Sequence, residues 1–375
     1  MNAQNLLEIL VNQNSHHDHI TGIMTVLETI ANEAQGLGLL IDWHRAVYGK
    51  PSALCATLPA VEHNKAISPI RTILLVTHAD TVFPVDSNFQ KISWNDDRSR
   101  AVGPGVIDDK GGIIVTLLLL EKLATLSSRD YEVKLLCMPS EEIGSPGFSK
   151  WLEAQSATAS IILGFEPSLP DGSIIHSRRG NRWYEFTLQG PGGHAGRDAG
   201  KVMNPGSALA SLISEIEKIG KPEQGSSTTL GSFHSNTNGF NVIPSEAIAK
   251  LDVRYESNQL RDQVHEDILR VIEKSAYSDQ VKWKLHEDCP AMRLNVESIG
   301  LGKSLAEEIE KIEGRKISVV AAAGSSDSNY LYQPGIPMID GLGAVGTGLH
   351  TENETLETAS LETRAEAIFK VIAKL

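Results

Sequence analysis

Short apolar runs alternate with longer apolar patterns through the first half of the chain. Residues 71–77 form a run rich in β-branched side chains, which is typical of a buried strand, whereas 113–126 is apolar over the length of a helix. Further strands are predicted at 39–46, 131–138 and 160–165, and further helices within 3–35 and at 147–154. Strands that alternate with helices predict an α/β domain built on a mostly parallel sheet.

The pattern changes near Gly180. Residues 181–189 alternate between apolar and polar side chains, as expected for a half-buried strand of a different sheet. The elements predicted after it are a helix at 204–219, strands at 228–234 and 247–255, a helix at 258–275 and a strand at 281–287. This β-α-β-β-α-β order predicts a ferredoxin-like two-layer domain.

Helices and strands resume after Pro290. They are predicted as helices at 298–311 and 361–375, strands at 317–322 and 338–342, and a turn at 324–327 that opens a further helix. The sequence therefore predicts an α+β domain over residues 180–289, inserted between two parts of one α/β domain, residues 1–179 and 290–375.

Composition narrows the possible partners. The chain has 34 Lys and Arg against 47 Asp and Glu, a net charge of −13 that argues against a nucleic-acid or anionic membrane surface. No apolar run reaches membrane-spanning length, and the N-terminus has no signal-peptide pattern. The three widely spaced cysteines suggest buried thiols in a reducing compartment, so we expect a cytoplasmic protein.

Polar side chains follow three successive predicted strands. His78 and Asp80 end the first and point to the same face, Glu141 and Glu142 end the second, and Glu166 ends the third. A single His-x-Asp is usually only a polar strand end. Because parallel strands end at the same edge of a sheet, the recurrence predicts a functional site there.

We expect two further residues at the same edge of the sheet, which are Asp108 in a Gly-rich turn and His350 in a late Gly-rich loop. Histidines and carboxylates suit zinc, with cobalt and manganese as alternatives. With one carboxylate as a bridge, two such ions would polarise a carbonyl and generate hydroxide, and a remaining acid would move the proton. A second polar cluster, residues 14–19 with three histidines, lies between two helix patterns and is interpreted as a capped loop rather than a metal site.

The ordered motifs HADTV, GPGVIDDKGG, PSEEIG, FEP, GGHAG and GLH resemble those of the M20 family of zinc metallopeptidases, and within it the glutamate carboxypeptidase branch. The resemblance extends from about Leu6 to the C-terminus. It implies two zinc ions per chain with five ligands, which are His78, Asp108, Glu142, Glu166 and His350.

The resemblance also implies a role for each residue of this set. His78 and Glu166 would bind one ion, Glu142 and His350 the other, and Asp108 would bridge them. Glu141 would be the general base, and Asp80 would fix the His78 imidazole. The peptide bond between Asp108 and Asp109 would be cis.

The inserted domain resembles the lid of the family, which also forms the dimer. His194, in GGHAG, matches a histidine that stabilises the oxyanion at the partner's metal centre, while a polar turn residue is the alternative. Asn241 and Arg254 match positions that hold the substrate carboxylate, with strand-edge polarity as the alternative, and Gly324 matches a substrate loop.

Two departures from the glutamate-specific relatives concern the substrate. The lysine that follows FEP in those relatives is missing, with Ser173 near its place, and alanines at 321–323 replace an arginine and glycines. A preference for C-terminal glutamate is therefore not expected. Arg178, at the domain junction, could bind an anion or form a solvated hinge.

We therefore predict an M20-type carboxypeptidase, a homodimer through the inserted domain, that cleaves an amide bond next to a free carboxylate in a small molecule or short peptide. The alternative within this chemistry is an N-acyl-amino-acid deacylase, similar to acetylornithine deacetylase or succinyl-diaminopimelate desuccinylase. A non-catalytic metal-binding or peptide-binding protein is the alternative of another class. Glu141 argues against it, because a binding module needs no base beside its metals.

Overall fold

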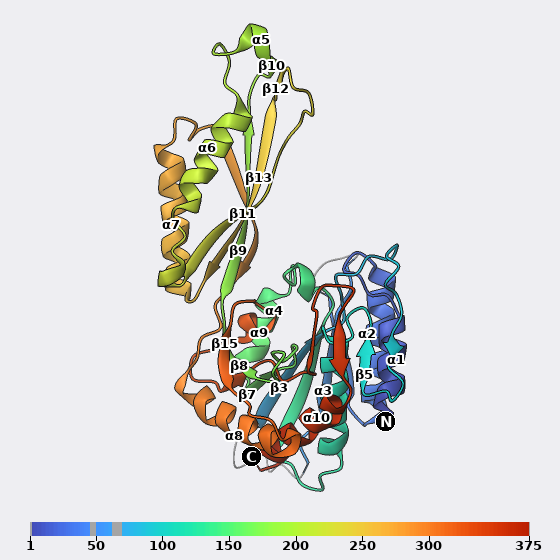
Figure 1. Ribbon diagram of the computed structural model, residues 1–375. Coiled ribbons are helices and arrows are strands. Elements are labelled where there is room, and N and C mark those ends of the chain that lie inside the picture. Colours follow the sequence, from blue (N-terminus) through green and yellow to red (C-terminus); the bar gives the residue numbers. More distant parts are fainter. Residues whose placement is uncertain (1, 46–49, 62–69, 375) are drawn as a thin grey trace. The chain divides into compact units, whose positions relative to one another are not determined.

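The computed structural model describes residues 2–45, 50–61 and 70–374 (Figure 1). The chain forms two compact units. Unit 1 contains the residues up to Ser177 together with Leu294–Ala322 and the residues from Ser326 onward, and unit 2 contains Arg178–Arg293 and Ala323–Ser325.

The core of unit 1 is a six-stranded sheet with the order β1-β2-β6-β3-β7-β16. Its strands are β1 (Leu40–His44), β2 (Ala53–Leu58), β3 (Arg71–His78), β6 (Tyr131–Met138), β7 (Ile161–Gly164) and β16 (Met338–Ile339). The four strands from β6 to β16 are parallel, and β1 and β2 add to them in antiparallel orientation. The prediction of a mostly parallel sheet is thus confirmed. Ala46, within the first predicted strand, lies outside the described residues.

Helices cover this sheet. They are α1 (Ala3–Asn12), α2 (Ile20–Gly36), α3 (Lys110–Ala124), α4 (Ser149–Ser156), α8 (Val296–Glu313), α9 (Ser328–Leu331) and α10 (Ala359–Ile372). α3 is apolar on all sides because it packs against β3, α1 and α10. Its first turn contains Gly112, where a Cβ atom would lie 2.1 Å from the carbonyl oxygen of Phe165. Only glycine therefore allows α3 to begin so close to the end of β7.

Short strands complete unit 1, and one of them, β15 (Val319–Ala322), lies within the strand predicted at 317–322. A four-stranded antiparallel sheet has the order β17-β18-β5-β4, with β4 (Ser93–Trp94), β5 (Arg100–Val102), β17 (Gly346–Thr347) and β18 (Thr355–Glu357). A two-stranded sheet pairs β8 (Ile174–Arg178) with β15 (Val319–Ala322). The pairing of β18 with β5 connects the C-terminal Gly-rich loop to the segment that precedes the Asp108 turn.

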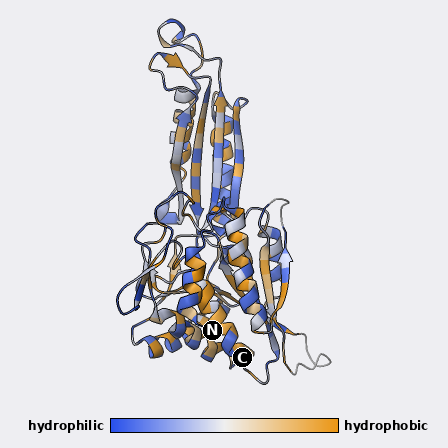
Figure 2. Ribbon diagram, turned by 90° about the vertical axis from the view of Figure 1, so that its right-hand side faces the viewer, coloured by the Kyte–Doolittle hydropathy of each residue, from blue (hydrophilic) through white to orange (hydrophobic). Residues whose placement is uncertain are grey.

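Unit 2 is a separate two-layer domain. Its antiparallel sheet has the order β11-β13-β9-β14, with β9 (Gly180–Gln189), β11 (Ser226–Ser235), β13 (Glu246–Tyr255) and β14 (Val281–Cys289). Helices α6 (Pro205–Glu217) and α7 (Asn258–Lys274) pack together against one face. Hydrophobic and hydrophilic residues alternate along the central strands β9 and β13 (Figure 2), so these two strands direct their apolar side chains to one face of the sheet. This confirms the ferredoxin-like arrangement.

A small extension lies at one end of this sheet. It contains β10 (Gly193–His194), α5 (Ala195–Asp198) and β12 (Val242–Ile243). Outside this extension, the short 3-10 helix η2 (Pro222–Gln224) follows α6. Each unit has its own cluster of buried apolar side chains. Among the described helices, none combines the length and the hydropathy that crossing a lipid bilayer requires.

Candidate metal centre

Three strand ends of the six-stranded sheet bring polar side chains to one place. His78 is the last residue of β3 and is paired with Met138, the last residue of the parallel strand β6. The chain after β6 turns into the short 3-10 helix η1 (Glu141–Ile143), and Glu166 follows β7. The predicted convergence of His78, the two glutamates and Glu166 therefore follows from the parallel register.

Asp80 holds this edge together. Its side chain is completely buried. One carboxylate oxygen accepts the backbone N–H of Glu141 at 3.0 Å, and the other accepts that of Glu142 at 3.1 Å. The Nδ1 atom of His78 lies 3.3 Å from the same carboxylate and 3.1 Å from the Asp80 carbonyl oxygen. Asp80 thus contacts the His78 imidazole and also fixes the backbone of the glutamate pair.

Asp108 lies between the two histidines. Its Oδ1 atom is 2.9 Å from Nε2 of His78, and its Oδ2 atom is 3.1 Å from Nε2 of His350. Each histidine also faces a second carboxylate, because Nε2 of His78 is 3.8 Å from Glu166 and Nε2 of His350 is 3.3 Å from Glu142. One carboxylate with its two oxygens directed at different histidines is the arrangement that a bridging ligand requires.

The donor atoms are close enough to share ions. Ligand atoms of His78, Asp108 and Glu142 lie within 4.8 Å of one another, and so do those of His78, Glu141 and Glu166. Imidazole nitrogens and carboxylate oxygens form a set that zinc accepts. The residues present therefore fit two divalent ions, although the second group leaves open whether Glu141 is a ligand or a base.

The ionisable groups of the site shift one another's pKa values. Burial works to raise the pKa of Asp108, but hydrogen bonds from His350 and His78 hold it below its usual range. The hydrogen bond with Asp108, followed by that with Glu142, raises the pKa of His350 to about 10. Burial, then the nearby Glu166, raises the pKa of Glu141 well above that of an ordinary glutamate. Metal binding would therefore displace protons from the histidines.

The backbone at the site has two unusual features. The peptide bond between Asp108 and Asp109 is cis, as the resemblance implies, and the buried Asp109 side chain accepts the backbone N–H of His78 at 3.3 Å. His350 has φ +60°, a left-handed conformation that residues other than glycine rarely adopt. A left-handed backbone at a residue other than glycine is found mostly at functional sites.

Two buried ionisable groups beside the Asp108 turn were not predicted. Glu354 accepts backbone N–H groups of that turn, and burial, then repulsion from Asp108, raises its pKa to about 8. Lys110 donates to the carbonyl oxygen of Gln13 at 3.3 Å, and burial lowers its pKa to about 8. Lys110 carries a sequence signal, as a charged residue at the start of an apolar helix pattern. Glu354 lies in a polar stretch and carries none.

Two of the predicted residues of unit 2 lie close together. The exposed His194 ends β10, which pairs with β12, and the exposed Asn241 immediately precedes β12. The carbonyl oxygen of Asn241 accepts the backbone N–H of Ala195 at 2.9 Å. The His194 ring is held locally, because its Nδ1 atom accepts the N–H of Gly196 at 3.1 Å.

The remaining predicted residues of unit 2 form a second group. Arg254 donates to both carboxylate oxygens of Asp252, at 2.7 and 2.9 Å, and its third nitrogen lies 3.5 Å from Oγ of Ser325. Arg178 donates to the carbonyl oxygen of Gly324 at 3.2 Å. The structure thus brings Arg254, Arg178 and Gly324 together. The Nε–Nη2 edge of the Arg254 guanidinium binds Asp252, whereas its Nη1 atom is directed at Ser325.

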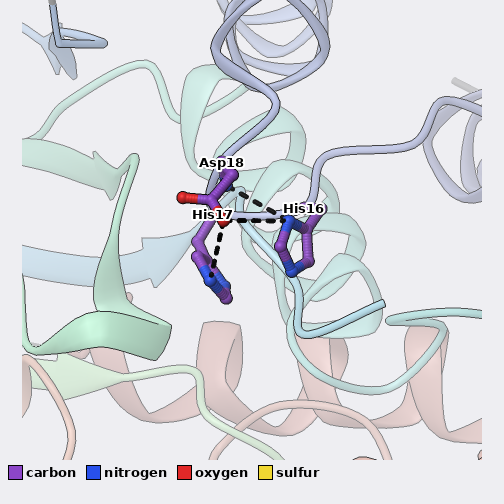
Figure 3. A group of neighbouring side chains, drawn as sticks. All are labelled: His16, His17 and Asp18. Atoms are coloured by element: carbon purple, nitrogen blue, oxygen red, sulfur yellow. Dashed lines mark hydrogen bonds and ion pairs between the residues drawn. The ribbon is translucent and has the colours of Figure 1, made fainter. Parts of the chain in front are cut away.

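The N-terminal histidine cluster is a turn between α1 and α2 (Figure 3). Nδ1 of His16 accepts the backbone N–H of Asp18 at 3.3 Å, and Asn14 accepts that of His16. The Asp18 carboxylate, 82% exposed, lies 3.6 Å from Nε2 of His17 and 4.0 Å from Nδ1 of His16. These three residues are close enough to hold an ion. Since the nearest nitrogen of His16 already serves the turn, the geometry favours the capped loop.

Comparison with known proteins adds sequence and fold relatives. A family model described as peptidase family M20/M25/M40 matches residues 74–374. Carboxypeptidase G2 of Pseudomonas sp. (strain RS-16) is 26% identical over 313 residues, which cover 81% of this chain and 74% of that protein. Succinyl-diaminopimelate desuccinylase of Pseudomonas syringae pv. syringae is 25% identical over 297 residues, which cover 75% of this chain and 76% of that protein.

Solved structures share the fold over the whole chain. The M20 family metallo-carboxypeptidase Sso-CP2 from Sulfolobus solfataricus has a TM-score of 0.84 at 19% identity and covers 100% of both chains. A tripeptidase from Staphylococcus aureus has a TM-score of 0.80 at 20% identity, covering 100% of this chain and 98% of the other.

Proposed function

Because this chain belongs to peptidase family M20/M25/M40, whose members hydrolyse peptide and amide bonds, we propose that it is a two-metal hydrolase that cleaves an amide bond next to a free carboxylate. The observation that carries the proposal is the Asp108 carboxylate. Each of its oxygens faces a different histidine, and each histidine faces a further carboxylate.

Five side chains are the proposed ligands of two zinc ions. His78 and Glu166 would hold one ion, Glu142 and His350 the other, and Asp108 both, with cobalt or manganese as alternative metals. When bound, two such ions polarise a carbonyl group and acidify water. The chain itself supplies the orientation of the ligands, through the contacts of Asp80 with His78 and with the backbone of the glutamate pair.

Glu141 is the proposed general base. Asp80 fixes its backbone, and its partly buried carboxylate lies among the ligand atoms of His78 and Glu166. Its raised pKa suits a group that accepts a proton from water near neutral pH and returns it to the leaving amine. This role also separates the proposal from a non-catalytic binding protein on the same fold.

The substrate is proposed as a small molecule or short peptide with a free carboxylate. Arg254, Asn241, Arg178 and Gly324 would bind it, and His194 would stabilise the oxyanion. The names of the two relatives favour two versions of this chemistry. Carboxypeptidase action is the first, and removal of an N-acyl group from an amino acid is the second, because one relative is a succinyl-diaminopimelate desuccinylase.

A homodimer through unit 2 completes the proposal. The segment around His194 and Asn241 exposes apolar side chains, with Phe240 fully exposed and Val242 44% exposed. Such side chains are typical of an interface between subunits. Sedimentation of the purified chain would test the proposed dimer. We also propose that the protein is cytoplasmic.

The deciding experiment combines metal analysis with a hydrolysis panel. Protein reconstituted with zinc should retain two ions per chain and hydrolyse at least one class among N-acyl amino acids (including N-acetylornithine), dipeptides and acyl-glutamates. One ion or fewer would contradict the bridged site. Two ions without hydrolysis across the panel would favour the binding protein.

A further inference from the structure

Glu354 is a completely buried acid whose carboxylate faces the turn of Asp108. Its Oε1 atom accepts the backbone N–H of Ile107 at 2.9 Å and that of Asp108 at 3.1 Å. Its Oε2 atom accepts the N–H of Gly105 at 3.2 Å. Three N–H groups of one turn thus point at one carboxylate, in the manner of a backbone nest that binds an anion.

The backbone of Glu354 ties the same turn to the loop of His350. The N–H of Gly103 donates to the Glu354 carbonyl oxygen at 3.2 Å, and the Glu354 N–H donates to the Thr351 carbonyl oxygen at 3.1 Å. Thr351 directly follows His350. One residue therefore links two segments that are 249 positions apart, as the Gly105 contact shows.

We infer that Glu354 is a positioning residue that sets the separation of Asp108 and His350, and with it the geometry of the shared metal site. The inference rests on the proposed function, because it concerns ligands of the proposed ions. It goes beyond that function by assigning a role to a residue outside the set of proposed ligands and substrate residues.

The charge and the shape of Glu354 are both needed for this role. The three N–H groups need both carboxylate oxygens of Glu354 as acceptors. An alanine at this position would leave these buried donors without a partner. A glutamine keeps the shape and one acceptor oxygen for Ile107 and Asp108, but turns an NH₂ group toward the N–H of Gly105. The damage should therefore be partial for Glu354→Gln and full for Glu354→Ala.

The test measures metal binding rather than hydrolysis alone. Residues that orient metal ligands typically change metal affinity by about 10- to 100-fold when substituted. Glu354→Ala should weaken binding of one zinc ion by about that factor, and Glu354→Gln by less. With cobalt as the probe, the visible absorption spectrum should change in shape, which a loss of folded protein alone cannot produce.

Glu313→Ala is the matched control. Glu313 is another acid of unit 1 with a side chain only 5% exposed, and it accepts Arg364 Nε at 2.8 Å and Arg315 Nε at 2.7 Å. It contacts none of the proposed ligands in the described part of the chain. Its loss should lower the melting temperature while metal affinity and the cobalt spectrum stay unchanged.

Three outcomes separate the two proposals. Wild-type protein with two ions and a Glu354→Ala variant with one weakened ion would support the inference. Equal affinities and identical cobalt spectra for these two proteins would overturn it and leave the proposed function intact. Wild-type protein that binds one ion or none would contradict the proposed function itself.

Discussion

The metal centre of unit 1 and the predicted substrate residues of unit 2 are built differently. In unit 1, His78, Asp80 and Asp108 are buried and are held by contacts with segments distant in the sequence. In unit 2, His194 and Asn241 are exposed, and the side chains of His194 and Arg254 are held mainly by neighbours within a few residues. The structure thus preorganises the proposed metal ligands and leaves the proposed substrate residues on locally supported side chains.

This contrast follows from what each set must do. Metal ligands must be positioned precisely, and strand ends in a packed sheet supply that precision. Residues that recognise a substrate can vary with the substrate, and loops and strand edges allow this. His350 is the exception in unit 1, because its side chain is 54% exposed. Its left-handed backbone and the Glu354 contacts compensate for the missing burial.

The largest expected effect separates the two possible roles of Glu141. Glu141→Gln keeps the shape of the side chain but cannot accept a proton, so kcat should fall by about 10²- to 10⁴-fold while two zinc ions remain bound. Turnover of the best panel substrate and metal analysis check this. Loss of one ion would identify Glu141 as a ligand instead.

Glu153→Gln is the control for this variant. Glu153 lies on α4 and is exposed, so its substitution should leave both turnover and metal content unchanged. Full activity of Glu141→Gln would overturn the proposed mechanism and would bring the metal centre closer to the simple binding protein.

The convergence of the strand ends could be predicted because it depends on local patterns. Arg71–His78 and Tyr131–Met138 are clear strand signals, and a parallel register places the residues after them at one edge. The metal ligands followed from that geometry together with the family motifs. The comparisons confirm the M20 resemblance and the ferredoxin-like insertion, whereas the individual ligand roles remain predictions.

The residues that sequence patterns missed depend on contacts between distant segments. The Glu354 side chain accepts backbone N–H groups of residues that lie 246 to 249 positions earlier in the sequence. No local sequence pattern encodes such a contact. Four short strands, β4, β5, β17 and β18, have two or three residues each. Such segments are too short to show the alternation of apolar and polar residues that predicts a strand. β2 (Ala53–Leu58) was not predicted because it contains only one of the β-branched or aromatic side chains that usually mark a strand. Asp252 lies two positions before Arg254 on one strand face, so its competition for the guanidinium could have been predicted.

A smaller effect is expected in unit 2. Arg254→Lys removes the fork of donors that suits a carboxylate, so KM should rise about tenfold or more while kcat changes little, consistent with a loss of about 1.5–3 kcal/mol of charged hydrogen bonding. Steady-state kinetics on the best panel substrate check this split. A fall in kcat with constant KM would instead place Arg254 with the catalytic set.

Arg182→Lys is the matched control in the same unit. Arg182 also donates two hydrogen bonds to one carboxylate, that of Asp288, at 2.7 and 2.8 Å, and it is buried. It lies outside the predicted substrate set, so its substitution should lower stability and leave KM unchanged. Equal changes in KM for the two variants would mean that unit 2 responds as a whole and that Arg254 has no specific role.

The smallest expected effect concerns the N-terminal histidines, which have the residue types of the metal centre without its supports. Among the described residues, His16 and His17 form ion pairs only with Asp18, which is largely exposed, whereas the buried Asp80 orients His78. His17→Ala should therefore leave the zinc content at two ions per chain and should change the free energy of unfolding by less than about 1 kcal/mol. Metal analysis beside the wild-type protein and chemical denaturation check both values. A third ion that the wild-type protein binds and this variant lacks would contradict the expectation. Suitable donor atoms at short distances would then be enough to bind zinc, without a buried carboxylate that orients the histidines.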